Sequence, residues 1–438
     1  MSAVPWIRLD NGLEVIARPN GAARSIAVQL VLEAGAAFDP AEKEGTAALV
    51  ASLLDRGAGS LSAAAIAGFF DDLGVAYAAE AHRDTLDIRL RLLSDHLPGV
   101  LERLRLIVAE PTFPGTEVGR QKGQLLTTIA ERDQDTAAVS EMGLQEALFP
   151  PGHPYRHPRL GTRDSVSRIE RADLVAFHRH RFRSSGAIVS MAGDFDPARA
   201  LALAASILGT WNGGADGPAR GARGTAGTAP GPAARASIPD PPAPDRTIVV
   251  VKPIDGKTQA DIALGFRGPR RLSPDLPASL VLNSILGEFS LGGRLGKVIR
   301  ERAGLAYYVY SRFSAGLGPG PFVARAGVAP DRVRRALDLM RRTIEQIVRR
   351  GVTPGELRDS KQALAASVPR SMETNPEAAA ILADAEFYGL GIDYPWRLAE
   401  MIRAVTRRDV EEAARKYLTP RSCVLVVAGP ELEKETLA

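Results

Sequence analysis

Residues 187–193 read AIVSMAG, and residues 423–429 read CVLVVAG. Each run is almost entirely apolar and ends in Ala-Gly, and each follows a helix-like segment that opens at an Asp, Asp173 in one case and Asp409 in the other. A short apolar run without polar alternation predicts a strand that is buried on both faces. Because the two passages share length and order, they predict that one helix–strand unit occurs twice in the chain.

A second pair of passages supports the same repeat. TFPG at 112–115 is followed by Lys122, and VTPG at 352–355 is followed by Lys361. Both pairs imply a shift of roughly 236 to 240 residues, and a repeat this long is a duplicated domain rather than a solenoid. The sequence therefore predicts an α+β protein with two homologous α/β domains, at residues 1–211 and 246–438.

The segment between the two domains has a different composition. Residues 212–235 contain seven Gly and three Pro and almost no large apolar side chain. Such a segment cannot bury enough surface to offset the entropy lost on ordering, so we expect a mobile linker. Four prolines between 239 and 244 stiffen its end, and we place the whole linker at 212–245.

The composition excludes several classes of protein. The 438 residues are 45% hydrophobic and 24% charged, which is ordinary for globular domains. The net charge of +4 is spread along the chain, which does not favour a nucleic-acid partner. The single cysteine, Cys423, excludes an internal disulfide and predicts a buried thiol. No apolar run is long enough to span a membrane and the start has no signal pattern, so we expect a soluble, cytoplasmic protein.

Four motifs in order carry a family resemblance. They are NGLEV (11–15), GTAALVAS (45–52), LF…GHPY…LGT (148–162) and RL…IRE…GLAY (294–307). Together they resemble the pitrilysin-like zinc metallopeptidases, the group that includes insulin-degrading enzymes and mitochondrial processing peptidases. The resemblance covers nearly the whole chain. It implies two homologous domains that form half of a peptidase clamshell.

The resemblance also shows what is missing from this chain. Active members carry an inverted zinc motif, His-x-x-Glu-His, and a Glu further along the chain. The matching positions here are Ala48, Ala51, Ser52 and Thr128. Alanine offers no ligand atom, and a neutral hydroxyl is a poor zinc ligand. We therefore expect no metal and no cofactor in this chain.

Other histidines do not replace the missing ligands. His153 and His157 are four residues apart but are interleaved with prolines, so no regular helix presents them on one face. His178 and His180 point to opposite sides of a predicted helix. We expect these four, and the isolated His82 and His96, to be surface or hydrogen-bonded side chains.

Two residues match the catalytic pair that the family contributes from its C-terminal half, Arg300 and Tyr307. In the family this pair holds the substrate carbonyl and stabilises the oxyanion. The residue types suit that role, since Arg is always charged and a Tyr hydroxyl donates at neutral pH. The resemblance implies further substrate-binding positions in an edge strand and a glycine-rich loop, namely Ala78, Ala79, Gly292 and Gly293.

The resemblance therefore implies a non-zinc subunit of a heterodimeric zinc metallopeptidase. Its partner would be a homologous chain of about 400 residues that carries the zinc motif, because two domains supply only half of the family's chamber. The substrates would be short or unfolded peptides. Two alternatives stay open, a catalytically silent structural subunit and a peptide-binding homodimer.

Overall fold

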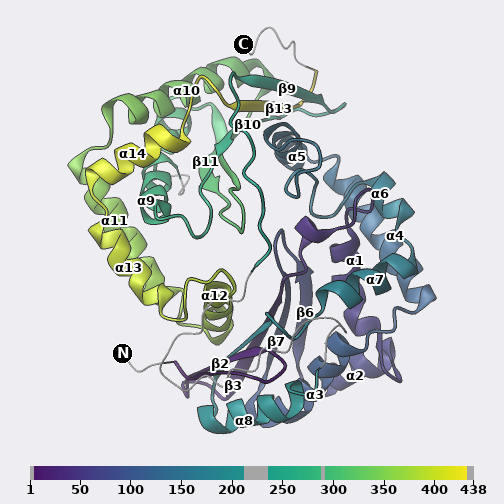
Figure 1. The fold of residues 1–438 in the computed structure, drawn as a ribbon. Helices are drawn as coiled ribbons and strands as arrows, with labels where there is room; N and C mark the ends of the chain where they lie inside the picture. The colour runs from purple at the N-terminus through teal and green to yellow at the C-terminus, as the bar shows by residue number, and fades with distance from the viewer. Residues whose placement is uncertain (1–3, 212–234, 288–291, 432–438) are drawn as a thin grey trace. The chain divides into compact units, whose positions relative to one another are not determined.

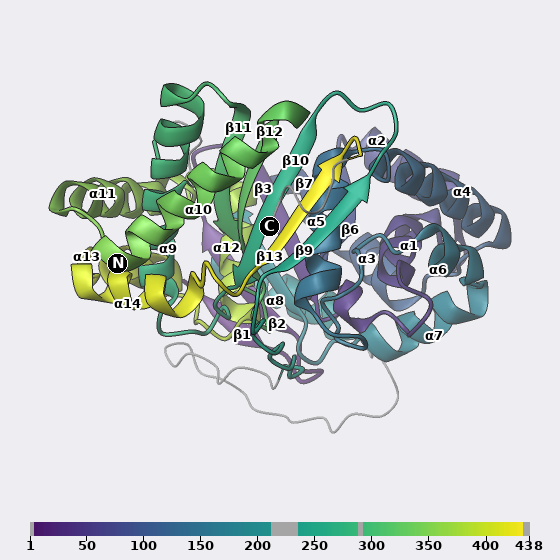
Figure 2. The ribbon, with the colours of Figure 1, turned by 90° about the horizontal axis from the view of Figure 1, so that it is seen from above.

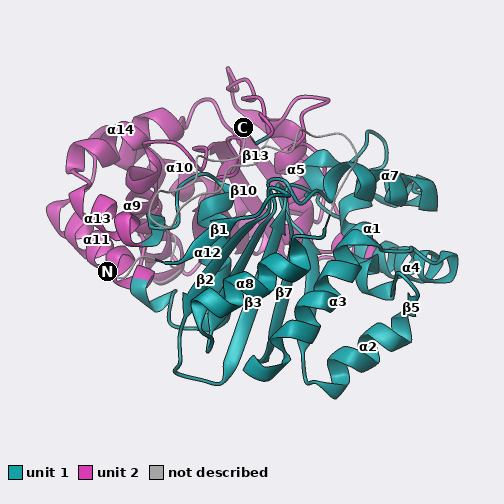
Figure 3. Ribbon diagram, turned by 60° about the horizontal axis from the view of Figure 1, so that its bottom comes forward, with its two compact units in different colours: residues 1–129, 159–235, 369–395 teal, residues 130–158, 236–368, 396–438 magenta. Residues whose placement is uncertain are grey.

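The computed structural model describes residues 4–211, 235–287 and 292–431 (Figure 1). The predicted linker, 212–245, therefore lies mostly outside the described residues. The chain divides into two compact units, which Figure 3 shows in different colours. Unit 1 comprises residues 1–129, 159–235 and 369–395, and unit 2 comprises residues 130–158, 236–368 and 396–438. Each unit contains helices and a sheet, so the predicted α+β class is confirmed.

Unit 1 contains a six-stranded sheet in the order β1-β2-β8-β3-β7-β6. Its strands are β1 (Trp6–Arg8), β2 (Glu14–Pro19), β3 (Ser25–Leu32), β6 (Ala76–Ala81), β7 (Leu86–Leu93) and β8 (Ile188–Gly193). A two-stranded sheet pairs β4 (Gly57–Ala58) with β5 (Leu61–Ser62). Every residue of β8 is buried, as the apolar run predicts. The strand lies parallel to β2 and antiparallel to β3.

The helices of unit 1 follow the same order along the chain. They are η1 (Ala36–Phe38), α1 (Thr46–Leu53), η2 (Leu54–Arg56), α2 (Ala63–Asp72), η3 (Ser94–His96), α3 (Leu97–Ala109), α4 (Gly115–Arg132), α6 (Arg163–Arg168), α7 (Arg171–Arg181), α8 (Pro197–Leu208) and α12 (Asn375–Phe387). The core includes alternate residues of β3, such as Val28 and Leu30, together with residues of α1, α3 and α7.

Unit 2 contains a five-stranded sheet in the order β11-β12-β10-β13-β9. Its strands are β9 (Ile248–Pro253), β10 (Ala260–Arg267), β11 (Ala306–Phe313), β12 (Pro321–Val328) and β13 (Val424–Gly429). Figure 2 shows β10, β13 and β9 side by side. Cys423, the residue before β13, is buried as predicted.

The helices of unit 2 come from the second half of the sequence, apart from α5. They are α5 (Thr136–Leu148), α9 (Leu276–Leu286), η4 (Gly296–Arg302), η5 (Pro330–Arg332), α10 (Val333–Arg350), α11 (Pro354–Arg370), α13 (Tyr394–Ala404) and α14 (Arg407–Tyr417). The parallel pairing of β13 with β9 repeats that of β8 with β2. The strand of each repeated helix–strand unit therefore has the same parallel pairing in both sheets.

The repeated Asp and Lys residues have structural roles that explain why they recur. Asp173 and Asp409 each lie at the third position of a helix, in a capping box with the residue that precedes the helix. Helix α7 therefore begins two residues before Asp173, where the sequence indicated its start. Lys122 donates to the carbonyl of Ile169 at 2.9 Å, and Lys361 donates to that of Val405 at 2.7 Å. Each lysine thus fixes the start of the capped helix in its own unit.

The compact units do not follow the two sequence halves, because each contains a helix from the other half. Helix α12 packs on β3 and β8 in unit 1, and α5 packs on β10 and β13 in unit 2. The side-chain amide of Asn375 donates to the carbonyl of Ser25 at 3.0 Å, and the Tyr388 hydroxyl donates to Asp84 at 3.2 Å. In unit 2, Gly265 lets α5 approach, since a Cβ there would lie 2.2 Å from Leu144. The bounds predicted from the sequence for the two repeated domains, 1–211 and 246–438, stay a prediction.

Candidate functional site

The positions that match the zinc motif lie together in unit 1. Ala48, Ala51 and Ser52 of α1 and Thr128 of α4 line one pocket of about 300 Å³. Ala79 of β6 lines the same pocket, whereas its neighbour Ala78 is exposed on β6 and is not among the lining residues. The structure therefore brings five of the sequence-predicted positions to one pocket, four on helices and Ala79 on an edge strand.

The side chains in this pocket do not fit a zinc ion. The Ser52 hydroxyl donates to the carbonyl of Leu49 at 2.8 Å, and the Thr128 hydroxyl donates to that of Gln124 at 3.2 Å. Both hydroxyls thus bond within their own helices, and neither is a thiolate, imidazole or carboxylate. Among the residues that the structure describes, no group of three or more His, Cys, Asp and Glu side chains could hold a metal ion.

Helix α1 is held in place by a carboxylate at its start. The amides of Gly45 and Ala47 each donate to Asp39 at 2.7 Å. Gly45 adopts φ +99°, a conformation that favours glycine. Burial raises the pKa of Asp39 to about 7, and the two backbone hydrogen bonds oppose that increase. The helix that bears the vacated ligand positions is therefore anchored by the glycine and the carboxylate together.

The edge of the pocket carries a pair of opposite charges. Arg159 donates to Glu80 at 2.6 Å and to the carbonyl of Ala81 at 2.8 Å, and Arg89 also bonds to Glu80, at 2.9 Å. Burial raises the pKa of Glu80, but these hydrogen bonds and the charges of Arg159 and His82 outweigh it, so the pKa lies below its ordinary value. The pocket therefore has a charged rim whose charges already compensate one another.

The buried Gln121 was not predicted from the sequence. It lies on the same face of α4 as Gln124, Leu125 and Thr128. All four residues line the pocket. The i, i+3, i+4, i+7 spacing is a signal that could have identified this face once Thr128 was chosen. A glutamine on a polar helix does not by itself indicate a site.

Arg300 and Tyr307 lie in unit 2 at two irregular points of the backbone. Arg300 belongs to η4, a π-helical segment in which the amide of Ala303 bonds to the carbonyl of Val298 at 3.2 Å. Tyr307 is the extra residue of a β-bulge, because Ala306 pairs with Val328 and Tyr308 pairs with Gly327. Bulges and π-helical turns occur often at functional sites, where they redirect a side chain.

The side chains of Arg300 and Tyr307 are not engaged by the rest of the described chain. Tyr307 is 83% exposed, the most exposed large side chain of its kind among the described residues. Within the described part of the chain, no residue hydrogen-bonds or forms an ion pair with the Arg300 guanidinium or the Tyr307 hydroxyl. Gly304, at φ +59°, ends the helical segment between them, and the Leu305 amide bonds back to Ile299 at 3.0 Å.

The glycine-rich stretch before η4 is described only at its ends. Residues 288–291 lie outside the described residues. Gly292 is exposed, whereas Gly293 is buried, and a Cβ there would lie 2.5 Å from the Cα of Gly287. Gly293 is therefore required where two backbone segments pass close together.

The paired histidines serve local structure. His153 is buried in unit 2, where its Nδ1 accepts from the Tyr155 amide and its Nε2 lies 3.0 Å from the carbonyl of Pro239. His178 is held similarly by the carbonyl of Val108 at 2.8 Å, and burial lowers its pKa. Both rings are thus used by hydrogen bonds rather than offered to a metal.

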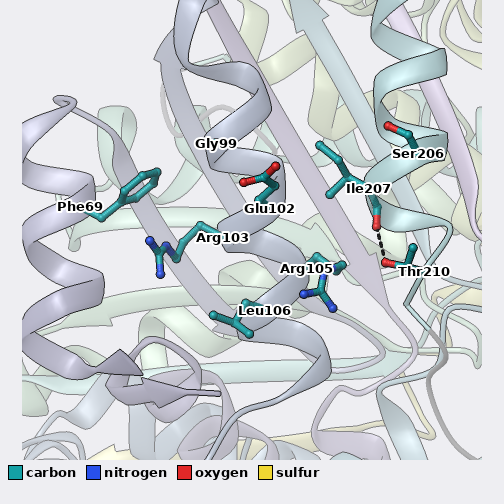
Figure 4. A pocket seen from close by; sticks show the side chains of 9 residues that line it. All are labelled: Phe69, Gly99, Glu102, Arg103, Arg105, Leu106, Ser206, Ile207 and Thr210. Atoms are coloured by element: carbon teal, nitrogen blue, oxygen red, sulfur yellow. Dashed lines mark hydrogen bonds between the residues drawn. The ribbon is translucent and has the colours of Figure 1, made fainter. Parts of the chain in front are cut away.

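A larger pocket of about 470 Å³ lies between α2, α3 and α8 in unit 1, and it contains none of the predicted residues (Figure 4). Arg103 stacks on the ring of Phe69 at 4.4 Å, and Arg105 pairs with Glu110 at 3.3 Å. Its cationic side chains are therefore already engaged. No helix in the described ranges is long and apolar enough to cross a membrane.

Comparisons with known proteins agree with this picture. The family model described as insulinase, peptidase family M16, matches residues 14–162, and the model described as peptidase M16 inactive domain matches residues 168–364. An uncharacterised zinc protease of Mycobacterium tuberculosis is 27% identical over 431 residues, which cover 98% of this chain and 94% of the relative. A non-peptidase homologue, YmxG of Helicobacter pylori, is 22% identical and covers 89% of this chain and 85% of the relative.

A solved structure shows the same fold. A crystal structure titled as a peptidase M16 inactive domain, from Pseudomonas fluorescens, matches with a TM-score of 0.87 and 27% identity, and covers 98% of each chain. The two family models together span most of the chain. The chain therefore belongs to peptidase family M16.

Proposed function

We propose that this chain is the non-zinc subunit of a heterodimeric metallopeptidase and that it supplies Arg300 and Tyr307 to the active site of a zinc-bearing partner. The observation that carries the proposal is the exposure of Tyr307, at a bulge, with no hydrogen-bond partner for its hydroxyl among the described residues. An exposed aromatic ring on a redirected backbone has no evident role in the packing of its own unit.

The chemistry of the pair suits an oxyanion. Guanidinium and phenol groups are both hydrogen-bond donors, and neither needs to change its protonation state near neutral pH. Donors fixed in advance where negative charge develops lower the barrier of acyl transfer. In the proposed complex, Arg300 and Tyr307 hold the substrate carbonyl oxygen, while zinc and the general base belong to the partner chain.

Unit 1 offers a place for an extended substrate. Strand β6 is an edge strand and pairs with β7 alone. The amide of His82 bonds to the carbonyl of Thr85 at 2.7 Å, so the backbone groups of Ala81, and by alternation those of Ala79, face away from β7. Ala79 rather than Ala78 would therefore pair with a short or unfolded peptide by strand addition.

Co-expression with a homologous chain that carries His-x-x-Glu-His tests the proposal. We expect a stable mixed complex that cleaves short unfolded peptides, whereas each chain alone is inactive. A mixed complex without activity would indicate a structural subunit. Assembly of this chain with itself alone would indicate the peptide-binding homodimer.

A further inference from the structure

The pocket between α2, α3 and α8 holds an arginine without a hydrogen-bond acceptor among the described residues (Figure 4). The guanidinium carbon of Arg103, on α3, lies 4.4 Å from the centre of the Phe69 ring on α2. This contact engages the flat face of the guanidinium, whereas its N–H groups point outward in the plane of the group. The Nε of Arg103 is buried, and no residue in the described ranges bonds to the guanidinium or forms an ion pair with it. A buried donor without an acceptor is costly, so Arg103 points to an anion that a ligand supplies.

A carboxylate lines the same pocket and is not paired with this arginine. Glu102 precedes Arg103 on α3 and is exposed, and within the described part of the chain no residue bonds to its carboxylate or forms an ion pair with it. The third ionisable residue of the lining, Arg105, is compensated by Glu110 at 3.3 Å. The pocket therefore presents one cation and one anion to a ligand.

The rest of the lining combines apolar walls with hydrogen-bond acceptors. Phe69, Leu106 and Ile207 are half-buried, pack against the core of unit 1 and line the pocket. The hydroxyls of Ser206 and Thr210 donate to backbone carbonyls of α8 at 2.8 and 2.7 Å, so towards an occupant they can only accept. The volume of about 470 Å³ lies in the range of small-molecule sites.

These groups together narrow the chemistry of an occupant. A ligand with only a negative charge would meet Glu102, and one with only a positive charge would meet Arg103. A neutral apolar ligand would leave the Nε of Arg103 without an acceptor. A small zwitterion fits all of them, because its carboxylate accepts from Arg103, its ammonium donates to Glu102 and to the hydroxyls, and an apolar side chain covers Phe69.

We propose that the pocket between α2, α3 and α8 binds a small zwitterion with an apolar side chain, either a free α-amino acid or a dipeptide. The site uses neither Arg300 nor Tyr307 and requires no partner chain. Its failure would therefore leave the proposed subunit role standing, and the reverse also holds.

Isothermal titration calorimetry of the isolated full chain tests this site. The zwitterionic probes are phenylalanine and the dipeptide Ala-Phe, and the single-charge probes are phenylpropanoate, which lacks the ammonium, and phenethylamine, which lacks the carboxylate. We expect one zwitterion to bind about tenfold more tightly than either single-charge probe, because each of these loses one charged hydrogen bond. Tighter binding of phenylalanine identifies a free amino acid as the ligand, and tighter binding of Ala-Phe identifies a dipeptide.

Two variants assign the two charges separately. Arg103→Met keeps an apolar contact with Phe69 and should abolish the preference for the zwitterion over phenethylamine. Glu102→Gln, at an exposed side chain, should abolish the preference over phenylpropanoate while the thermal unfolding midpoint stays close to that of the wild type. Arg342→Met on the exposed face of α10 should retain both preferences.

Two results would overturn the proposal. One is that neither zwitterion binds more tightly than phenylpropanoate and phenethylamine do. The other is that both preferences persist in Arg103→Met and in Glu102→Gln.

Discussion

The carboxyl groups of Glu14 and Glu386 are hydrogen-bonded to each other inside unit 1. Glu14 lies on β2 and Glu386 on α12, and each is only 4% exposed. Arg8 of β1 pairs with Glu14 through its Nε at 3.1 Å, and the charge of Arg235 also acts on Glu386. The helix from the C-terminal half is therefore attached to the sheet of the N-terminal half through an acidic contact.

This contact predicts a pH-dependent stability. Burial, and then the charge of Glu14 and its hydrogen bond, raise the pKa of Glu386 to about 7. The folded protein therefore binds the proton of the Glu386 carboxyl group more tightly than the unfolded chain does. The contribution of this proton to the free energy of unfolding is lost as the pH rises from about 4.5 to about 7.

The variant Glu386→Gln should abolish the loss of stability at high pH, because an amide donates a hydrogen bond to Glu14 at every pH. We expect its free energy of unfolding to exceed that of the wild type by about 1–3 kcal/mol at pH 8, with the difference vanishing near pH 4.5. Urea unfolding at several pH values measures it. Glu373→Gln, at an exposed carboxyl before the start of α12, should show no such trend. A gain in Glu386→Gln that is as large at pH 4.5 as at pH 8 would refute the assignment.

Restoring the ligands should restore a metal site. The triple variant Ala48→His, Ser52→His and Thr128→Glu places two imidazoles four residues apart on α1 and a carboxylate across the same pocket. We expect about one zinc per chain after dialysis, measured by elemental analysis, and none in the wild type. Zinc in the wild type, or none in the variant, would show that these are not the ligand positions.

The exchange of α5 and α12 predicts how a cleaved chain behaves. A specific protease site inserted within 212–234 should yield two fragments that co-elute under native conditions, because each compact unit contains a helix from both fragments. Gel filtration with and without denaturant measures this. Fragments that separate without denaturant would contradict the exchange.

The close approach at Gly293 predicts a local sensitivity. Gly293→Ala brings a methyl group against Gly287, and we expect it to lower the free energy of unfolding by about 1–3 kcal/mol. Gly292→Ala, at an exposed neighbour, should change it by less than about 0.5 kcal/mol. Denaturant titration compares the two, and equal effects would argue against the packing described.

The sequence was informative where local chemistry repeats. Asp173 and Asp409 occupy equivalent capping boxes, and the strands after them are buried on both faces, so both copies of the unit could be predicted. The family motifs likewise identified the four positions that match the zinc ligands and the general base, and these line the pocket beside β6. These features depend on residues that are close in the chain or on a family pattern.

Other features could not be predicted because they depend on distant partners. The composition of α12 is compatible with a buried helix, but it does not indicate which sheet receives the helix, so the exchange with α5 could not be predicted. Gln121 has the composition of a solvated helix face, and only its neighbours across the pocket make it buried. The Glu14–Glu386 contact joins residues from opposite ends of the chain, which no local pattern records.

The central claim is that Arg300 and Tyr307 act on a substrate held by a zinc-bearing partner. The most direct test is the peptide-cleavage rate of the mixed complex with Tyr307→Phe or Arg300→Ala, at unchanged assembly and zinc content, with Tyr310→Phe on the same strand as the control. The account predicts that each of the first two variants lowers turnover by about 10²–10³-fold, the usual cost of removing an oxyanion donor, while the control does not. Full activity with both Tyr307→Phe and Arg300→Ala would contradict it.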